Sequence, residues 1–230
     1  MRTSLRHNIT RYKITKAIAY LFLILYGITC LGPFIWCLIS AFKTSDEILV
    51  YPFSLPKVLQ FNNFPIAWTV GRFAVYLKNT IISVFLSTII LIVIAPMASY
   101  VVARVMPSKI LYTYFTLGIM IPIHTVLLPT LILTRSFQLQ NTYLSLILVY
   151  IAFRISITVF ILVGFMKTIP SAYEEVAFLD GASRARIFFQ IIFPLTKPAI
   201  ATVGLLAVVE NWRAFLMPLV LITSKKLKVI

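Results

Sequence analysis

Residues 170–198 of this chain read PSAYEEVAFLDGASRARIFFQIIFPLTKP. This stretch is polar and helix-capable, and it lies between two apolar runs that are long enough to cross a membrane. Because unpaired backbone and charged groups are costly in lipid, the stretch is expected to connect the two runs outside the hydrocarbon core. It therefore predicts a helical membrane protein with a structured connection on one side of the membrane.

Local signals divide this connection into two short helices. The S-x-x-E spacing of Ser171 and Glu174 predicts a capping box at the start of the first helix. Asp180-Gly181 predicts its end, because glycine reaches positive φ without a steric penalty. The second helix is expected to run until Pro194 ends it. Both helices carry apolar side chains at helical spacing, so an amphipathic pair is expected.

Composition extends this prediction to the whole chain. The 230 residues are 60% hydrophobic and only 12% charged, which is typical of a polytopic membrane protein and not of a soluble one. The net charge of +15 does not indicate nucleic-acid binding, because the basic residues are scattered between apolar runs and form no basic helix face. A nucleic-acid partner is therefore excluded.

Five apolar runs are long enough, at roughly 20 or more residues each, to span the membrane. They lie at 17–42, 79–103, 110–134, 143–166 and 199–223. Each must be helical, because the lipid leaves no partner for an unpaired backbone group and no alternating barrel pattern is present. The predicted fold is an all-α polytopic bundle with five legible spans.

The basic residues that flank the spans predict their orientation, since cytoplasmic connections carry the excess of Lys and Arg. That excess places the N-terminus and the connection around 170–198 in the cytoplasm. The expected organisation is a cytoplasmic N-terminal segment 1–16, a transmembrane domain 17–223 with an external loop 43–78 and a cytoplasmic loop 167–198, and a tail 224–230.

Prolines predict two irregular regions. Three of them exclude a long helix from the loop 43–78. In the third span, Pro122 and Pro129 indicate a kink or break. His124 lies in this break, where it is either a structural histidine with satisfied hydrogen bonds or a pore-lining group.

The helix pair in the loop 167–198 has two possible roles on physical grounds alone. Its apolar faces suit a protein partner, which would make the loop a docking surface. Alternatively, both helices lie in the lipid interface, where Arg184 and Arg186 would face anionic headgroups.

A family resemblance favours the docking role. The run from Glu174 to Ala182, EEVAFLDGA, followed by Phe188, Pro194 and Pro198, resembles the E-A-A…D-G-A…P loop of permease subunits of binding-protein-dependent ABC importers. Further segments resemble the carbohydrate branch of that family, of the maltose and multiple-sugar type. They are PFIWCLISAFKTSDEI (33–48), YLKNTIIS (76–83), ASYVVAR (98–104) and NTYLSLIL (141–148).

In that family the loop forms coupling helices that sit in a cleft of a cytoplasmic ATPase, so the resemblance implies ATPase docking here. Val176 departs from the pattern, which has alanine at this position. The resemblance assigns the following residues to the coupling loop: Glu174, Glu175, Ala177, Asp180, Gly181, Ala182, Arg184, Phe188 and Pro194.

The fifth span carries charges where lipid would disfavour them. The segment ENWRAFLMPLVLIT (210–223) resembles the family's W-N-x-F-x-x-P-L segment, although Arg213 replaces the usual asparagine and Ala214 a common acidic residue. We expect Glu210 to pair with Arg213 or with Arg154 of the fourth span, because an unpaired buried charge is costly. These charges are either purely structural or part of a translocation path. The candidates for that path are Glu210, Asn211, Trp212, Arg213 and Arg154.

The resemblance implies a heteromeric importer in a bacterial or archaeal cytoplasmic membrane. Its expected partners are a second permease subunit, a cytoplasmic ABC ATPase dimer, an extracytoplasmic solute-binding protein, a sugar substrate and membrane lipid. The family has six spans whereas this sequence shows five, which suggests a truncated product. The alternatives are a truncated non-transporting assembly or decoy subunit, and a secondary transporter.

Enzyme activity is not expected of this chain. The sequence has no G-x-x-x-x-G-K phosphate loop, so ATP would be hydrolysed by the partner ATPase and no cofactor bound here. Cys30 and Cys37 both lie in the first span and predict neither a disulfide framework nor a metal site. No catalytic constellation of carboxylates, serine or histidine is apparent inside the spans.

Overall fold

A computed structural model describes residues 2–229, with side chains from Tyr12 onward. The described residues form helices and turns and contain no strand, so the predicted all-α class is confirmed. The chain divides into two compact units, Met1–Gly71 and Arg72–Ile230. The first eleven side chains of the predicted segment 1–16, and Ile230 of the predicted tail, lie outside the described residues.

The first unit begins with a long helix, α1 (Arg2–Ser40). Its part from Tyr12 to Ser40 is long and apolar enough to cross a membrane, in agreement with the predicted first span. Pro33 lies within this helix, and both cysteines are exposed on it. A helix that is apolar on all sides suits a lipid or protein environment and not water.

An ordered irregular segment follows α1 and contains only two short helices, α2 (Ser45–Val50) and α3 (Asn63–Thr69). The side chain of Lys43 is 1% exposed, and its Nζ donates hydrogen bonds to the carbonyls of Tyr51 and Pro52 at 3.0 and 3.2 Å. The Asn63 amide nitrogen donates to two further carbonyls of the segment, at 2.9 Å each. These bonds satisfy a backbone without regular partners, as the prolines predicted.

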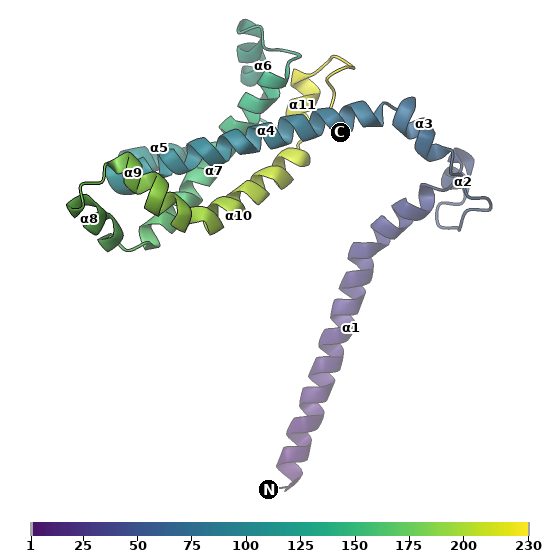
Figure 1. The fold of residues 1–230 in the computed structure, drawn as a ribbon. Helices are drawn as coiled ribbons and strands as arrows, with labels where there is room; N and C mark the ends of the chain where they lie inside the picture. The colour runs from purple at the N-terminus through teal and green to yellow at the C-terminus, as the bar shows by residue number, and fades with distance from the viewer. Residues whose placement is uncertain (1, 230) are drawn as a thin grey trace. The chain divides into compact units, whose positions relative to one another are not determined.

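Three long helices form the frame of the second unit (Figure 1). The first is α4 (Phe73–Tyr100), which continues through a π-helical turn at Val101–Val105. The second is α7 (Tyr143–Thr168). The third is composite and consists of α9 (Arg184–Ile187), a π-helical turn (Phe188–Ile192) and α10 (Phe193–Trp212). Each is long and apolar enough to cross a membrane.

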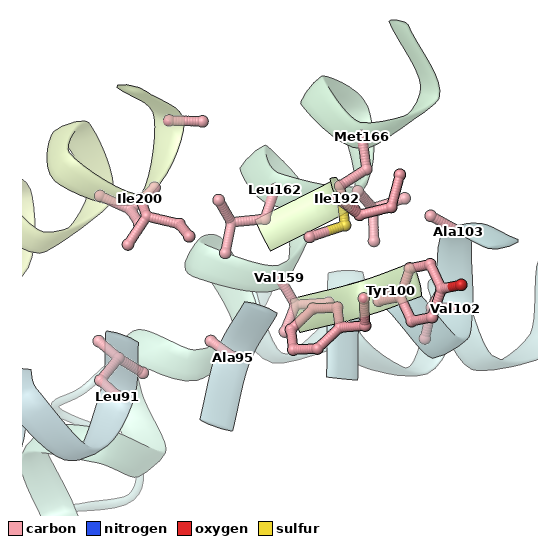
Figure 2. Close-up of a cluster of buried hydrophobic side chains, with 14 of the residues drawn as sticks. Leu91, Ala95, Tyr100, Val102, Ala103, Val159, Leu162, Met166, Ile192 and Ile200 are labelled. Carbon is pink, nitrogen blue, oxygen red and sulfur yellow. The ribbon is translucent and has the colours of Figure 1, made fainter. Parts of the chain in front are cut away.

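The core of the second unit lies where these three helices meet (Figure 2). This core includes Leu91 and Ala95 of α4 and Val159 and Leu162 of α7, all with 1% or less of their surface exposed. Gly204 of α10 lies so close to α4 that a Cβ there would be 3.3 Å from Ile92 Cγ2. Close approach at small residues is how helices gain packing energy in lipid, where burial alone gives little.

The predicted third span is interrupted in the structure. It consists of α5 (Lys109–Leu117), a 3₁₀ turn (Gly118–Met120), an irregular stretch, and α6 (Leu127–Ser136). Ile121 is extended, with φ −78° and ψ 112°, because the ring of Pro122 disfavours a helical conformation in the residue before it. Pro129 falls in the first turn of α6, where proline is tolerated.

The predicted end of the second loop helix at Pro194 is wrong, because the helix runs on into α10. Pro194 is the second residue of α10 and comes directly after the π-helical turn, where the change in hydrogen-bond pattern accommodates a residue without an N–H. The π-helical turn before it widens the helix, with the Phe193 N–H bonding to the Phe188 carbonyl. Within the turn of helix that follows, the Thr196 hydroxyl donates to the Ile192 carbonyl at 2.7 Å.

The predicted fifth span, 199–223, is also not one continuous helix. The helix stops at Trp212, and a short helix, α11 (Leu216–Leu221), begins after three residues of irregular chain. A continuous helix would bring the ring of Pro218 against the carbonyl of Ala214, four residues earlier. Four helices of the described chain are therefore individually membrane-length, whereas five spans were predicted.

Candidate functional site

The helix α8 (Ala172–Leu179) and the turn after it form the predicted coupling loop. Gly181 has φ +78° and ends α8, as predicted. Its N–H donates to the Phe178 carbonyl at 3.0 Å, and the N–H of Ala182 donates to the Ala177 carbonyl at 2.9 Å. This pair of bonds is a Schellman motif, which caps the last carbonyls of the helix and holds the turn in one shape.

The predicted capping box at the start of α8 is wrong. Ser171 has helical angles, φ −63° and ψ −23°, and its side chain makes no capping bond. Glu174 is instead 8% exposed and turns toward the ends of the long helices. Its Oε1 lies 3.4 Å from Nε of Arg104, and its Oε2 accepts a hydrogen bond from the Tyr100 hydroxyl at 3.4 Å. A guanidinium and a phenol together outcompete the local cap for this carboxylate.

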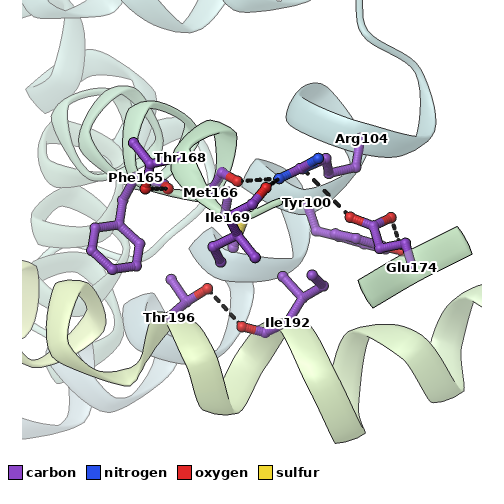
Figure 3. A network of polar contacts seen from close by, with 9 residues as sticks. All are labelled: Tyr100, Arg104, Phe165, Met166, Thr168, Ile169, Glu174, Ile192 and Thr196. Atoms are coloured by element: carbon purple, nitrogen blue, oxygen red, sulfur yellow. Dashed lines mark hydrogen bonds and ion pairs between the residues drawn. The ribbon is translucent and has the colours of Figure 1, made fainter. Parts of the chain in front are cut away.

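Arg104 extends this contact to a second helix (Figure 3). Its Nη2 donates to the Met166 carbonyl at 2.5 Å and also to the carbonyl of Ile169. The side chains of Arg104 and Glu174 are only 14% and 10% exposed, so their attraction is weakly screened by water. The network therefore joins α8 to the ends of both α4 and α7.

The structure divides the predicted coupling residues into a buried and an exposed set. Phe188 is buried and packs with its ring centroid 5.2 Å from that of Tyr100. The other buried members are Glu174 and Ala177, and Ala182 is half-buried. The exposed members are Glu175, Asp180, Gly181, Arg184 and Pro194.

Large apolar side chains stand next to the exposed set. Leu179 is 88% exposed at the tip of α8, and Tyr173, Val176 and Phe178 are also exposed. The Arg184 guanidinium lies 5.3 Å from the centroid of the Phe178 ring, which orders part of this surface through a cation–π contact. Together, Tyr173, Glu175, Val176, Phe178, Leu179, Asp180, Gly181 and Arg184 are called the loop surface here. The loop surface is a mixed apolar and charged patch that suits a protein partner.

The second candidate site is a cavity of about 570 Å³ in the same unit. Its walls come from the middle of α7, the C-terminal end of α10, the break between α5 and α6, and the start of α11. Gly118 belongs to the rim and lies so near α7 that a Cβ there would be 2.2 Å from the Ser156 hydroxyl oxygen. The helix breaks that shorten the two predicted spans therefore also open this cavity.

Charged residues meet at the cavity, as the sequence predicted. Oε2 of Glu210 lies 3.5 Å from Nη2 of Arg154 and 3.4 Å from Nε of Arg213, so both of the proposed pairings form. Arg154 Nε also donates to the Asn211 amide oxygen at 3.3 Å, and the Asn211 amide nitrogen donates to the Ser87 hydroxyl at 3.3 Å. One carboxylate is thus shared between two guanidinium groups.

Of the five predicted path residues, four line the cavity and Trp212 does not. Trp212 is 39% exposed elsewhere on α10. Aromatic walls that the sequence did not single out come from Tyr150, Phe153 and Phe215, and His124 lines the cavity as well. Tyr150 lies four residues before Arg154 on the same face of α7, and this spacing was the available signal for it. Phe153 is the direct neighbour of Arg154, and spacing gave no signal for it.

Two asparagines fasten the predicted tail to the unit. The Asn79 amide nitrogen donates to the carbonyls of Lys226 and Lys228, at 3.0 and 2.8 Å. The Asn141 amide oxygen accepts hydrogen bonds from the backbone N–H groups of Thr223 and Ser224, at 2.7 and 2.9 Å. Residues 223–228 are therefore held against the starts of α4 and α7.

The chain resembles known proteins over most of its length. Residues 92–229 match the family described as the binding-protein-dependent transport system inner membrane component. The diacetylchitobiose uptake system permease protein NgcG of Streptomyces coelicolor is 36% identical over 91% of this chain and 70% of its own length. The multiple sugar-binding transport system permease protein MsmG of Streptococcus mutans is 29% identical over 92% of this chain and 78% of its own length.

The fold has a counterpart among solved structures. A chain in the crystal structure of a bacterial ABC transporter involved in the import of the acidic polysaccharide alginate superimposes with a TM-score of 0.80. The alignment covers 94% of this chain and 76% of that chain at 18% sequence identity, so it bears on the fold alone. From the family match, the relatives and the membrane-length helices, we conclude that this multi-pass membrane protein belongs to the family of inner membrane components of binding-protein-dependent transport systems.

Proposed function

We propose that this chain is one permease subunit of an ATP-driven sugar importer and that it couples to a cytoplasmic ATPase through the loop surface. Family membership supports the importer class, and relatives such as NgcG and MsmG are named for sugar uptake. ATP would be hydrolysed by the partner ATPase, with no cofactor bound by this chain. A second permease subunit and an extracytoplasmic solute-binding protein would complete the assembly, with the N-terminus in the cytoplasm.

The buried Glu174–Arg104 pair is the observation that carries this proposal. A docking loop can move the membrane helices only if it is joined firmly to them. Glu174 is joined to Arg104 and Tyr100 at the end of α4, and Arg104 is bonded to two carbonyls at the end of α7. A force applied to the loop surface would therefore be transmitted to α7, whose middle lines the cavity, and to α4, whose Ser87 accepts a hydrogen bond from Asn211 of the lining, as rigid-body coupling requires.

The proposal places the two functions of the subunit at two sites. The loop surface would take up the movement of the ATPase, and the cavity would form part of the translocation path. Arg154 of α7 and Glu210 of α10 line the cavity on helices that also reach the loop end of the unit. Relative movement of these helices would change the cavity, which is the requirement for alternating access.

Disulfide crosslinking tests the docking. With Cys30 and Cys37 replaced by serine, a single cysteine at the 88% exposed Leu179 is paired with single cysteines along the ATPase cleft, in membranes that contain the whole complex. A crosslink that Asp180→Lys abolishes is expected, because Asp180 is exposed in the docking turn. Cysteine at the exposed Ser136 of α6 is the matched control and should give no crosslink.

Two results would count against the proposal. If Leu179→Cys forms no crosslink while the chain is stably inserted, the loop surface does not dock an ATPase and lies on lipid or elsewhere. If the crosslink forms but the complete complex shows no substrate uptake with any solute-binding protein tested, the chain is the non-transporting assembly subunit that the sequence left as an alternative.

A further inference from the structure

We infer that the cavity takes an anionic carbohydrate, one that bears a carboxylate, sulfonate or phosphate group, and that Arg213 binds this group. The inference rests on the proposed function, because it assumes that the cavity belongs to the translocation path of an importer. It goes further by assigning a chemical class to the substrate and a binding residue to the anion.

The charge balance of the cavity is the first observation. The ionisable residues that line it are Arg154, Arg213, Glu210, His124 and Tyr150. Two guanidinium groups, which stay protonated in proteins, face a single carboxylate. The cavity therefore holds an excess of one positive charge when His124 is neutral. A positive charge at membrane depth is costly unless it is paired or hydrated, so an anion that enters the cavity is stabilised there.

The two arginines are not equivalent, and Arg213 is the one that is available to bind an anion. The Arg154 side chain is 25% exposed and is held by both Glu210 and Asn211. The Arg213 side chain is 71% exposed, and within the described part of the chain its one ion-pair partner is Glu210, through Nε. Arg213 lines the cavity, and this ion pair does not engage its two Nη groups. They form the planar, two-pronged donor that suits carboxylate, sulfonate and phosphate oxygens.

Glu210 is the counter-charge that both arginines share, and a substrate anion would supply a second one. Its Oε2 is the atom that both arginines share, at 3.5 and 3.4 Å. An anion on the Nη side of Arg213 would complete the charge balance without displacing Glu210 from Arg154. Glu210 is therefore a positioning residue that holds both guanidinium groups at the cavity.

The remaining lining fits a sugar ring. Phe153, Tyr150 and Phe215 supply aromatic faces, which pack against the C–H faces of carbohydrates, and Asn211 supplies an amide. The volume of about 570 Å³ lies within the range of small-molecule sites, roughly 300–1,000 Å³. A neutral sugar would use the same aromatic faces but would leave the excess positive charge uncompensated.

Charged thiol reagents measure the potential in the cavity without knowledge of the natural substrate. In the complete complex, with Cys30 and Cys37 replaced by serine, Phe215→Cys places one thiol in the lining. Rates of modification are measured with an anionic reagent, a sulfonatoethyl methanethiosulfonate, and with a cationic one, its trimethylammonium counterpart. We expect Arg213→Gln to lower the ratio of anionic to cationic rates by roughly three- to tenfold, because one positive charge is removed nearby.

Two further variants sharpen the result. Arg135→Gln removes the same charge from an exposed site on α6 outside the cavity lining, and should leave the ratio unchanged. Arg213→Lys keeps the charge but loses the two-pronged geometry, so it should keep the ratio. Arg213→Lys also serves if Arg213→Gln fails to fold.

Ligand protection then tests the substrate class. Glucuronate is expected to slow the modification of Phe215→Cys at lower concentration than glucose, and this difference should disappear in Arg213→Gln and shrink in Arg213→Lys. Equal protection by the two sugars, protection by neither, or a reagent ratio that Arg213→Gln leaves unchanged would overturn the inference. The Leu179→Cys crosslink in the same complex separates the two proposals: if it forms, only the anion inference fails, and if it does not, the proposed function fails first.

Discussion

At the scale of single residues, Glu174 shows how tertiary contacts override a local signal. Its spacing from Ser171 suits a capping box, yet its carboxylate pairs with Arg104 and Tyr100 from another helix. A cap satisfies one backbone donor at a solvent-exposed helix start. A buried carboxylate without a partner costs more than a lost cap, so Glu174, once buried, remains with Arg104 and not with the helix start.

Removing the charge of Glu174 should therefore be costly. We expect Glu174→Gln to lower the free energy of unfolding by roughly 1–3 kcal/mol, since the ion pair is lost and the largely buried Arg104 is left without its counter-charge. The measurement is unfolding of the purified chain in mixed micelles. Glu175→Gln is the matched control, because Glu175 is exposed, and it should change stability by less than about 0.5 kcal/mol. Equal effects of the two variants would show that the buried pair is not important for stability.

Gly181 is the second residue whose identity matters locally. Its φ of +78° is a conformation that L side chains rarely adopt, while a Cβ at this position would meet no atom within 4 Å. Gly181→Ala should therefore lower stability by about 1–2 kcal/mol through backbone strain alone. Gly164→Ala in α7 also meets no atom, and should be neutral or stabilising because alanine favours helix over glycine. The same unfolding assay compares the two, and a neutral Gly181→Ala would contradict the strain argument.

At the scale of elements, two of the long helices owe their continuity or length to π-helical turns. One such turn extends α4 to Val105 and so brings Arg104 to Glu174 of α8. The other lies between α9 and α10 and lets the helix pass Pro194. The extra residue in a π turn shifts the register of the side chains that follow it. Both turns lie at the loop end of the unit, next to the Tyr100–Phe188 contact.

The contact between α4 and α10 depends on Gly204. A Cβ there would lie 3.3 Å from Ile92 Cγ2, so alanine requires a small shift and a larger side chain requires the helices to separate. We expect Gly204→Leu to lower the free energy of unfolding by roughly 1–3 kcal/mol, the usual cost of overpacking. Gly164→Leu, at a site with no atom within 4 Å, is the matched control. Similar stability of both leucine variants would show that α4 and α10 do not need this close approach.

At the scale of the whole molecule, residues far apart in the sequence form both candidate sites. Ser87 of α4, Arg154 of α7 and Asn211 of α10 are joined by hydrogen bonds of 3.3 Å beside the cavity. At the loop end, the Glu174–Arg104 pair joins segments 70 residues apart in number, from α8 and the end of α4. If the proposed coupling occurs, movement at one site would reach the other through these contacts between helices.

The charge cluster at the cavity leads to a prediction that depends on the contact between Glu210 of α10 and Arg154 of α7. Glu210→Gln leaves two guanidinium groups near each other without a carboxylate, so we expect a clear loss of folded chain in membranes. Adding Arg154→Gln removes one of the unpaired charges and should restore part of the loss. The readout is the amount of folded chain extracted from membranes, measured for both single variants and the double variant. Additive losses in the double variant would show that Glu210 and Arg154 are not coupled.

Much of this architecture could be predicted from local sequence. Apolar length gave the helical class and located the first, second and fourth spans closely, because lipid forces a backbone to satisfy its own hydrogen bonds. Asp180-Gly181 marked the turn after α8, because only glycine adopts its backbone angles without strain. The pairing of Glu210 with arginine followed from the cost of a lone charge in the membrane.

The tertiary structure alone decided what those elements do together. In the folded chain, Glu174 pairs with Arg104 and does not cap α8, and a helix continues past Pro194. The third and fifth spans are interrupted where they border the cavity. The tertiary structure also brought Tyr150, Phe153 and His124 to the same cavity and excluded Trp212 from its lining. Hydrophobic length and turn residues act within a few positions of the chain, so they determine the elements. Side-chain pairing and close helix packing depend on neighbours more than fifty residues away, which local sequence does not specify.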